Sequence, residues 1–305
     1  MSARLTTGFV ALCSVLFVSQ GAQAFCRTTT CDPNNPKEEC EHDGNRCLIT
    51  GVPLQWRSRC VTVGVHELGS PKLGFGFDDV APVVEQAFAT WLAADCGGGA
   101  GPSIEVNMLG PLECGLSEYN KQAANANIVL FREDDWPFVG AENAIALTTT
   151  RFDKLKGDLW DADIELNAVT ELLSIGDPVE GYDLLSVLTH EAGHFLGLSH
   201  TLDETATMKL TYDPTRDGTS FRDLADDDVN GICTIYPPDR RPATTSCENR
   251  HGFSEQCGAD QPPRDESEGC SVTSPGLARP SATLNMLALL AAACAARLAR
   301  RRRVV

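Results

Sequence analysis

Three histidines and one glutamate fall within eleven residues of this chain, at a spacing that suits a single metal ion. The run HEAGHFLGLSH contains, in order, His190, Glu191, His194, Gly197 and His200. Four residues of an α-helix advance about 400°, so His190 and His194 lie on one face about 40° apart. Gly197 suits a sharp exit from that helix, after which the chain can bring His200 to the same ion. Three neutral imidazoles that leave a fourth position to water are typical of a catalytic zinc site.

Glu191 adds a proton acceptor to this group. Zinc lowers the pKa of a bound water to about 7, and a nearby carboxylate can take the proton while the hydroxide attacks a carbonyl. Because Glu191 is next to His190 in sequence, it reaches the metal without being a ligand. The alternative is a surface helix with chance histidines, but average composition predicts the full pattern in only roughly one chain in 10⁵. The run therefore predicts metal-assisted hydrolysis, with Glu191 as general base and acid.

The elements around this run form a body of mixed α and β structure. Apolar residues centre opposite the two imidazoles at 100° per residue, namely Leu184, Leu185, Leu188, Phe195 and Leu196. We therefore predict a helix over residues 183–196 that buries one side and offers ligands on the other. Further helices are predicted over residues 80–92 and just before Pro237. Apolar and alternating runs predict strands over residues 59–65, 104–108, 128–131, 145–150 and 161–166.

The pattern HExxHxxGxxH, with Met208 following His200, resembles the signature of the metzincin zinc peptidases and is most similar to that of the matrixins. The resemblance covers about residues 53–237. It implies an α+β catalytic domain: a twisted, mostly parallel sheet with an active-site helix and a C-terminal helix, here stapled by disulfides. It also implies one catalytic zinc ion and protein or peptide substrates.

The resemblance assigns roles to residues beyond the zinc ligands. Met208 stands at the matrixin Met-turn position, which implies that it lies beneath the metal. Tyr212 matches the tyrosine that lines the matrixin S1′ pocket, although Leu210 replaces the usual proline. Asp227 and Asp228, in the last predicted helix, match the paired aspartates that support the Met-turn. Gly197, at the exit from the active-site helix, is the glycine of the signature itself.

Two further features of the matrixins have counterparts near the predicted sheet. The strand near residues 145–149 should be the exposed edge on which an extended peptide substrate adds as another strand. Four acidic residues lie where matrixins bind calcium, namely Asp158, Asp161, Asp163 and Glu165. Calcium prefers such oxygen ligands, but a solvated acidic edge would have the same composition. The sequence leaves both interpretations open.

Other matrixin features are missing. The segment around Cys60 lacks the Gly and Pro-Asp of the propeptide thiol motif, so we expect Cys60 in a disulfide and no latency through a cysteine switch. Animal matrixins hold a structural zinc with three further histidines. The remaining histidines of this chain, His42, His66 and His251, lie outside that region, so we expect no second zinc.

Both ends of the chain read as targeting segments. An apolar run between Arg4 and the small-residue site at residues 22–24 predicts a secretory signal peptide over residues 1–24. Near the other end, Cys270 precedes an apolar stretch and an arginine cluster within residues 282–305. This layout resembles the sorting tail of myxobacterial surface proteins, which implies removal of the tail and a lipid-modified Cys270 at the surface. A single-span anchor is the alternative, although the apolar stretch is short for one.

The cysteines indicate an oxidising compartment. Of thirteen, Cys13 lies in the signal peptide, Cys294 in the tail and Cys270 at the sorting position, which leaves ten for five disulfides. Between the ends we predict three parts. They are a Cys-rich segment over residues 25–50, the metallopeptidase domain over 51–238, and an acidic Pro/Ser-rich stalk over 239–281 with a disulfide-bonded knot at Cys247 and Cys257.

The composition completes the prediction. A formal net charge of −17 excludes a nucleic-acid binder that relies on positive charge. We expect a secreted, monomeric zinc endopeptidase at the cell surface or outer membrane, attached through its tail or a lipid on Cys270. The alternative is a catalytically silent, disulfide-rich adhesion or binding module that retains a zinc site. The presence of Glu191 favours the enzyme, because a scaffold has no physical need for that carboxylate.

Overall fold

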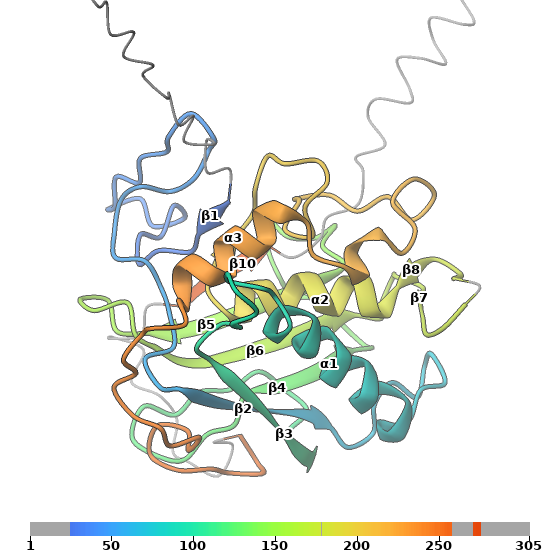
Figure 1. Cartoon of the computed structure of the whole chain (residues 1–305). Helices are drawn as coiled ribbons and strands as arrows, with labels where there is room; N and C mark the ends of the chain where they lie inside the picture. Colours follow the sequence, from blue (N-terminus) through green and yellow to red (C-terminus); the bar gives the residue numbers. More distant parts are fainter. Residues whose placement is uncertain (1–24, 178, 258–270, 276–305) are drawn as a thin grey trace, which may run out of the picture.

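The computed structural model describes residues 25–177, 179–257 and 271–275 (Figure 1). The predictions for the signal peptide, Cys270 and the tail over residues 282–305 lie outside the described residues. Within the described part of the chain, no helix is both long enough and apolar enough to cross a membrane.

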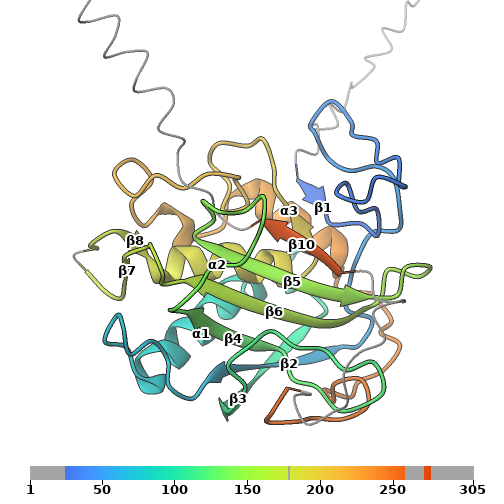
Figure 2. The same ribbon diagram turned by 180° about the vertical axis from the view of Figure 1, so that it is seen from behind.

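One six-stranded sheet forms the centre of the molecule (Figure 2). Its strands, in spatial order, are β10 (Ser271–Pro275), β5 (Ala146–Phe152), β6 (Leu159–Asn167), β4 (Ile128–Arg132), β2 (Cys60–His66) and β3 (Glu105–Leu112). Three of the five strand pairs are parallel, and the pairs of β5 with β6 and with β10 are antiparallel. The predicted α+β fold with a mostly parallel sheet is confirmed. The prediction that β5 is an exposed edge is wrong, because β10 pairs along it.

Two helices cover one face of this sheet (Figure 1). Helix α1 (Phe77–Leu92) packs against β2 and β3, and helix α2 (Leu184–Phe195) packs against α1, β5 and β6. Helix α1 begins at Phe77, before the predicted residue 80, and the Asp79 carboxylate accepts a hydrogen bond from the Gly76 amide at 2.8 Å, which helps to cap its N-terminus. Helix α3 (Asp226–Ile235) ends just before Pro237, as predicted.

Two buried tryptophans fix the position of α2 in the core. The indole of Trp91, on α1, donates a hydrogen bond to the Thr189 carbonyl at 2.7 Å. The indole of Trp56 donates to the Phe195 carbonyl at 2.8 Å. Both side chains are almost fully buried, so each indole N–H finds its partner inside the apolar cluster that joins the helices to the sheet. Helix α2 is therefore held both by apolar packing and by hydrogen bonds to its backbone.

Five disulfides cross-link the described chain, which confirms the predicted number. Their pairs are Cys26–Cys47, Cys31–Cys40, Cys60–Cys247, Cys96–Cys233 and Cys114–Cys257. The predicted knot joining Cys247 and Cys257 is wrong, because each bonds to the body of the fold. Residues 239–257 run back along the sheet domain, where the Arg59 amide donates to the Thr244 carbonyl at 2.7 Å. Cys247 and Cys257 are close in sequence but do not pair, because residues 239–257 lie against strands that are far away in the sequence.

Candidate metal centre and active site

The N-terminus of helix α2 is fixed by one buried carboxylate. The Asp183 side chain accepts a hydrogen bond from the Ser186 amide at 2.9 Å, which caps the helix. The guanidinium of Arg222 forms an ion pair with the same carboxylate at 2.7 Å. Asp183 is buried, and the paired charges offset its desolvation. The helix that carries His190, Glu191 and His194 therefore has a defined starting point.

A glycine turn leads from this helix to the third histidine. Gly197 has φ +99°, and a Cβ there would lie 2.7 Å from the Leu54 carbonyl oxygen, so only glycine fits without a shift. The chain then forms β9 (Leu198–Ser199), which pairs with β1 (Cys26–Arg27) and ends next to His200. The Cys-rich N-terminal segment thus contributes a strand to the support of a candidate ligand.

The three imidazoles converge on one point. The Nε2 atoms of His190 and His194 each lie 3.2 Å from the Nε2 atom of His200. Zinc–nitrogen bonds of about 2.0–2.1 Å at tetrahedral angles require nitrogen atoms roughly 3.3–3.4 Å apart. The three side chains therefore fit the geometry and the donor chemistry of one zinc ion.

The other ring nitrogens of the two helix histidines face backbone carbonyls. His190 Nδ1 lies 2.6 Å from the Thr207 oxygen, and His194 Nδ1 lies 3.0 Å from the Leu198 oxygen. A proton on each Nδ1 leaves the Nε2 lone pair for a metal. Burial lowers the pKa of His194 to about 4 and the pKa of His190 well below its usual range, so both rings are neutral at pH 7.

The Met-turn residue lies directly against the helix between the two histidines. Met208 is buried, and a Cβ added at Gly193 would overlap its Sδ atom and approach Trp91 to 2.7 Å. Asp228, at the start of α3, accepts hydrogen bonds from the amides of Thr207 at 2.7 Å and Met208 at 3.1 Å. Burial raises the pKa of Asp228 to about 6. Asp227 is also buried, and it is Asp228 that accepts the hydrogen bonds of the Met-turn amides.

A threonine that the sequence did not indicate contacts the candidate base. The hydroxyl of Thr148, on β5, lies 2.6 Å from Glu191 Oε2 and 3.3 Å from the Glu191 carbonyl oxygen. The shorter contact is to the carboxylate, and a bond to an ionised acceptor is the stronger one. Both residues are fully buried. Nothing local marks Thr148, because threonine is common in strands and the contact joins residues 43 apart.

Replacing Thr148 should show whether its hydroxyl orients Glu191. A hydrogen bond to a charged group contributes about 1.5–3 kcal/mol, so we expect Thr148→Val to lower kcat for peptide hydrolysis by roughly 10- to 100-fold. Thr148→Ser, which keeps the hydroxyl, should retain most of the wild-type kcat. The control is Thr149→Val, on the opposite face of the strand. An unchanged kcat in a zinc-loaded Thr148→Val protein would show that the hydroxyl has no such role.

Tyr212 lies close to the N-terminus of α2. Its hydroxyl donates to the Gly218 carbonyl and accepts from the Asp183 amide at 3.2 Å. Its ring packs against Tyr182 and Phe221, with centroids 5.5 and 5.2 Å away. The side chain is fully buried, so these contacts order the loop that follows the Met-turn. A role in substrate selection stays a prediction.

The acidic residues of β6 are buried, which contradicts the interpretation as a solvated edge. Asp161, Asp163 and Glu165 are each at most 3% exposed. Asp163 accepts hydrogen bonds from the Ser117 hydroxyl at 2.8 Å and the Ile128 amide at 3.1 Å. Within the described ranges, no three carboxylates bring oxygen atoms within 4.8 Å of one another. Calcium binding here stays a prediction.

These carboxyls should make stability depend on pH. Burial raises the pKa of Asp163 and that of Glu165 to about 7, above their usual values, so the folded state retains protons that the unfolded state releases. The stabilisation that the two protonated carboxyls contribute is fully present below about pH 4 and is lost as pH rises through 7. Asp163→Asn should therefore gain stability relative to wild type between pH 4 and 7, by at most about 1.4 kcal/mol per pH unit. Urea unfolding of both proteins across this pH range tests the prediction. A difference in unfolding free energy that does not change with pH would contradict the raised pKa of Asp163.

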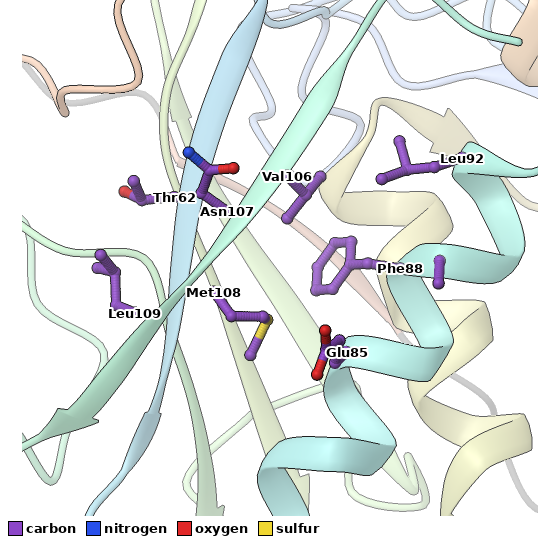
Figure 3. A pocket seen from close by; sticks show the side chains of 9 residues that line it. Thr62, Glu85, Phe88, Leu92, Val106, Asn107, Met108 and Leu109 are labelled. Carbon is purple, nitrogen blue, oxygen red and sulfur yellow. The ribbon is translucent and has the colours of Figure 1, made fainter.

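A separate groove of about 620 Å³ lies between α1 and β3 (Figure 3). It is lined by Thr62, Glu85, Phe88, Ala89, Leu92, Val106, Asn107, Met108 and Leu109. None of these is a candidate zinc ligand, and they include a single ionisable side chain, that of Glu85. The candidate zinc ligands and the candidate base are gathered instead at α2, His200 and β5.

The chain is similar to several known proteins. A family model described as Matrixin matches residues 55–237. Matrix metalloproteinase-C of Caenorhabditis elegans is 26% identical over 208 residues, which cover 63% of this chain and 32% of that protein. Matrix metalloproteinase-16 of Homo sapiens is 29% identical over 208 residues, covering 66% and 30%. Metalloendoproteinase 1-MMP of Arabidopsis thaliana is 35% identical over 109 residues, covering 34% and 27%. The chain spans about a third of the length of these relatives.

Proposed function

Because this chain belongs to the matrixin family, whose members use zinc, we propose that it is a secreted zinc endopeptidase that hydrolyses peptide bonds of extracellular proteins. The observation that carries the proposal is the convergence of three histidine side chains in a site that also contains a buried glutamate. His190, His194 and His200 would hold one zinc ion, and Glu191 would serve as general base.

The chemistry divides between the metal and the protein. A zinc ion at the three Nε2 atoms would act as a Lewis acid toward a peptide carbonyl and a water molecule. Glu191 accepts a proton from the attacking water and passes it to the nitrogen of the departing amine. The Thr148 hydroxyl holds the carboxylate in a fixed orientation for both transfers. Met208 and Asp228 support the floor of the site and keep the histidines in place.

Strand β10 occupies the outer edge of β5 in this structure, so a peptide substrate would have to take its place there to bind as an extended strand. Peptides add to sheet edges through main-chain hydrogen bonds, while pockets that receive side chains provide selectivity. The loop ordered by Tyr212 lies next to the active-site helix, and we assign side-chain preference to a pocket formed there.

The localisation follows from the ends of the chain. Residues 1–24 would direct export, and the disulfides of the body suit an oxidising compartment. Residues 25–50 would form a cross-linked N-terminal segment, 51–238 the peptidase domain, 239–281 a stalk and 282–305 the sorting tail. Attachment at the cell surface would use a lipid on Cys270 or the tail itself. We propose that the enzyme works as a monomer and binds no nucleic acid.

The competing proposal is a binding module that retains zinc without catalysis. The hydrogen bond between Thr148 and Glu191 favours the enzyme, because it orients a carboxylate that a purely structural zinc site would not use. The experiment is cleavage of casein, gelatin and a broad peptide panel by residues 25–270, before and after removal and restoration of zinc. We expect cleavage that is lost with the metal and regained with it. A zinc-loaded, folded protein that cleaves nothing would establish the binding module instead.

A further inference from the structure

A segment from near the end of the chain occupies the edge of the sheet beside the active site (Figure 2). Strand β10 pairs with β5 in antiparallel register through five consecutive residue pairs. The pairing runs from Ser271 opposite Arg151 to Pro275 opposite Leu147. Without β10, β5 would be the last strand on this side of the sheet.

The register places β10 next to the catalytic group. Ser274 lies opposite Thr148, the residue whose hydroxyl bonds to Glu191. Strand β5 also packs directly against helix α2, which carries His190 and His194. The backbone of β10 therefore runs along the part of β5 that lies nearest to the general base.

An incoming peptide would need the same backbone groups of β5. One side of an edge strand offers a single row of N–H and C=O groups, and these can pair with only one strand at a time. Because β10 belongs to the same chain, its pairing does not depend on protein concentration. Linked partners commonly have effective concentrations in about the millimolar range. A free peptide at micromolar concentration would therefore compete poorly for this edge.

We propose that residues 271–275 are a built-in competitive inhibitor that covers the substrate edge until the C-terminal segment is removed. This proposal rests on the proposed peptidase function. Ser271 directly follows Cys270, the residue that we predict to remain when the sorting tail is cut away. Cleavage after Cys270 would remove β10 together with the tail and expose β5. A single cleavage would then both process the protein for display at the surface and activate the peptidase.

The test breaks the pairing in the full chain. Successive residues of a strand direct their N–H groups to opposite sides, and proline has no N–H. Replacing both Val272 and Thr273 by proline therefore removes one donor that faces β5, whichever residue provides it. The matched control replaces Leu277 and Ala278 by proline, outside β10. For a short fluorogenic peptide, we expect kcat/KM of the β10 variant to rise about tenfold over wild type and control, mainly through a lower KM.

A binding measurement keeps the result independent of catalysis. Each form also carries Glu191→Gln, and a labelled peptide copying residues 269–277 is titrated by fluorescence anisotropy. The peptide should bind the β10 variant and not the form with an intact β10. Equal binding to both forms would overturn the proposal that β10 blocks the edge of β5, even if the protein proves not to be a peptidase. Rapid self-cleavage within residues 271–275, detected by mass spectrometry, would also overturn it, because the strand would then be a substrate. Absence of all cleavage, with the binding difference intact, would reject the peptidase and leave the covered edge established.

Discussion

Glu191→Gln should lower kcat/KM for peptide hydrolysis by roughly 10²- to 10⁴-fold, the range for loss of a general acid–base group. The amide of glutamine has nearly the shape of the carboxylate but cannot accept the proton of the attacking water. It can still accept the hydrogen bond from Thr148, so the local structure should persist. Zinc content should stay at one ion per chain, because the three imidazoles are unchanged.

The control for this variant is Glu67→Gln, which makes the same chemical change at an exposed position after β2. Its kcat/KM should match that of wild type. Zinc content by mass spectrometry and the thermal midpoint should be equal in all three proteins. If a zinc-loaded Glu191→Gln protein keeps activity within about threefold of wild type, another group must accept the proton.

Removing the Cys96–Cys233 disulfide should cause a large loss of stability together with a loss of zinc affinity. This bond joins residues 137 apart and ties helix α3 to the segment that follows α1. On the chain-entropy account, opening a loop of that length costs about 5 kcal/mol. Helix α3 also carries Asp228, which holds the Met-turn amides, so its loosening should weaken zinc binding as well.

The matched comparison uses two double variants, Cys96→Ala with Cys233→Ala and Cys31→Ala with Cys40→Ala. The second pair spans only 9 residues, for which the same account gives about 2.5 kcal/mol. Urea unfolding gives both free energies, and competition with a chelator gives zinc affinity. We expect only the first variant to lose zinc affinity. Equal losses in both measurements would show that the Cys96–Cys233 bond does not hold α3 against the Met-turn.

The features that could be predicted from the sequence are those set by local patterns. Helix α2 runs from Leu184 to Phe195 against a prediction of 183–196, because apolar spacing and the cap at Asp183 both act within a few residues. The meeting of His190, His194 and His200 follows from helix geometry and one glycine turn. Strand β5 was likewise found within two residues at each end.

The features that were missed depend on distant contacts. Thr148 meets Glu191 across 43 residues, and Cys60 meets Cys247 across 187. Periodicity carries no information about which strands become neighbours, so neither contact could be derived from it. Strand β10 was missed for a related reason: its five residues follow a polar segment, and pairing with β5 is what makes them a strand.

The three long disulfides also constrain when the molecule can be completed. Cys60, Cys96 and Cys114 each bond to a cysteine between 137 and 187 residues later in the chain. A polypeptide that emerges from its N-terminus can close the Cys26–Cys47 and Cys31–Cys40 bonds early. The other three bonds have to wait for residues 233, 247 and 257, which hold the partners of Cys96, Cys60 and Cys114. The Cys-rich N-terminal segment can therefore be cross-linked early in synthesis, whereas the disulfides of the sheet domain close only after residues 233–257 have been made.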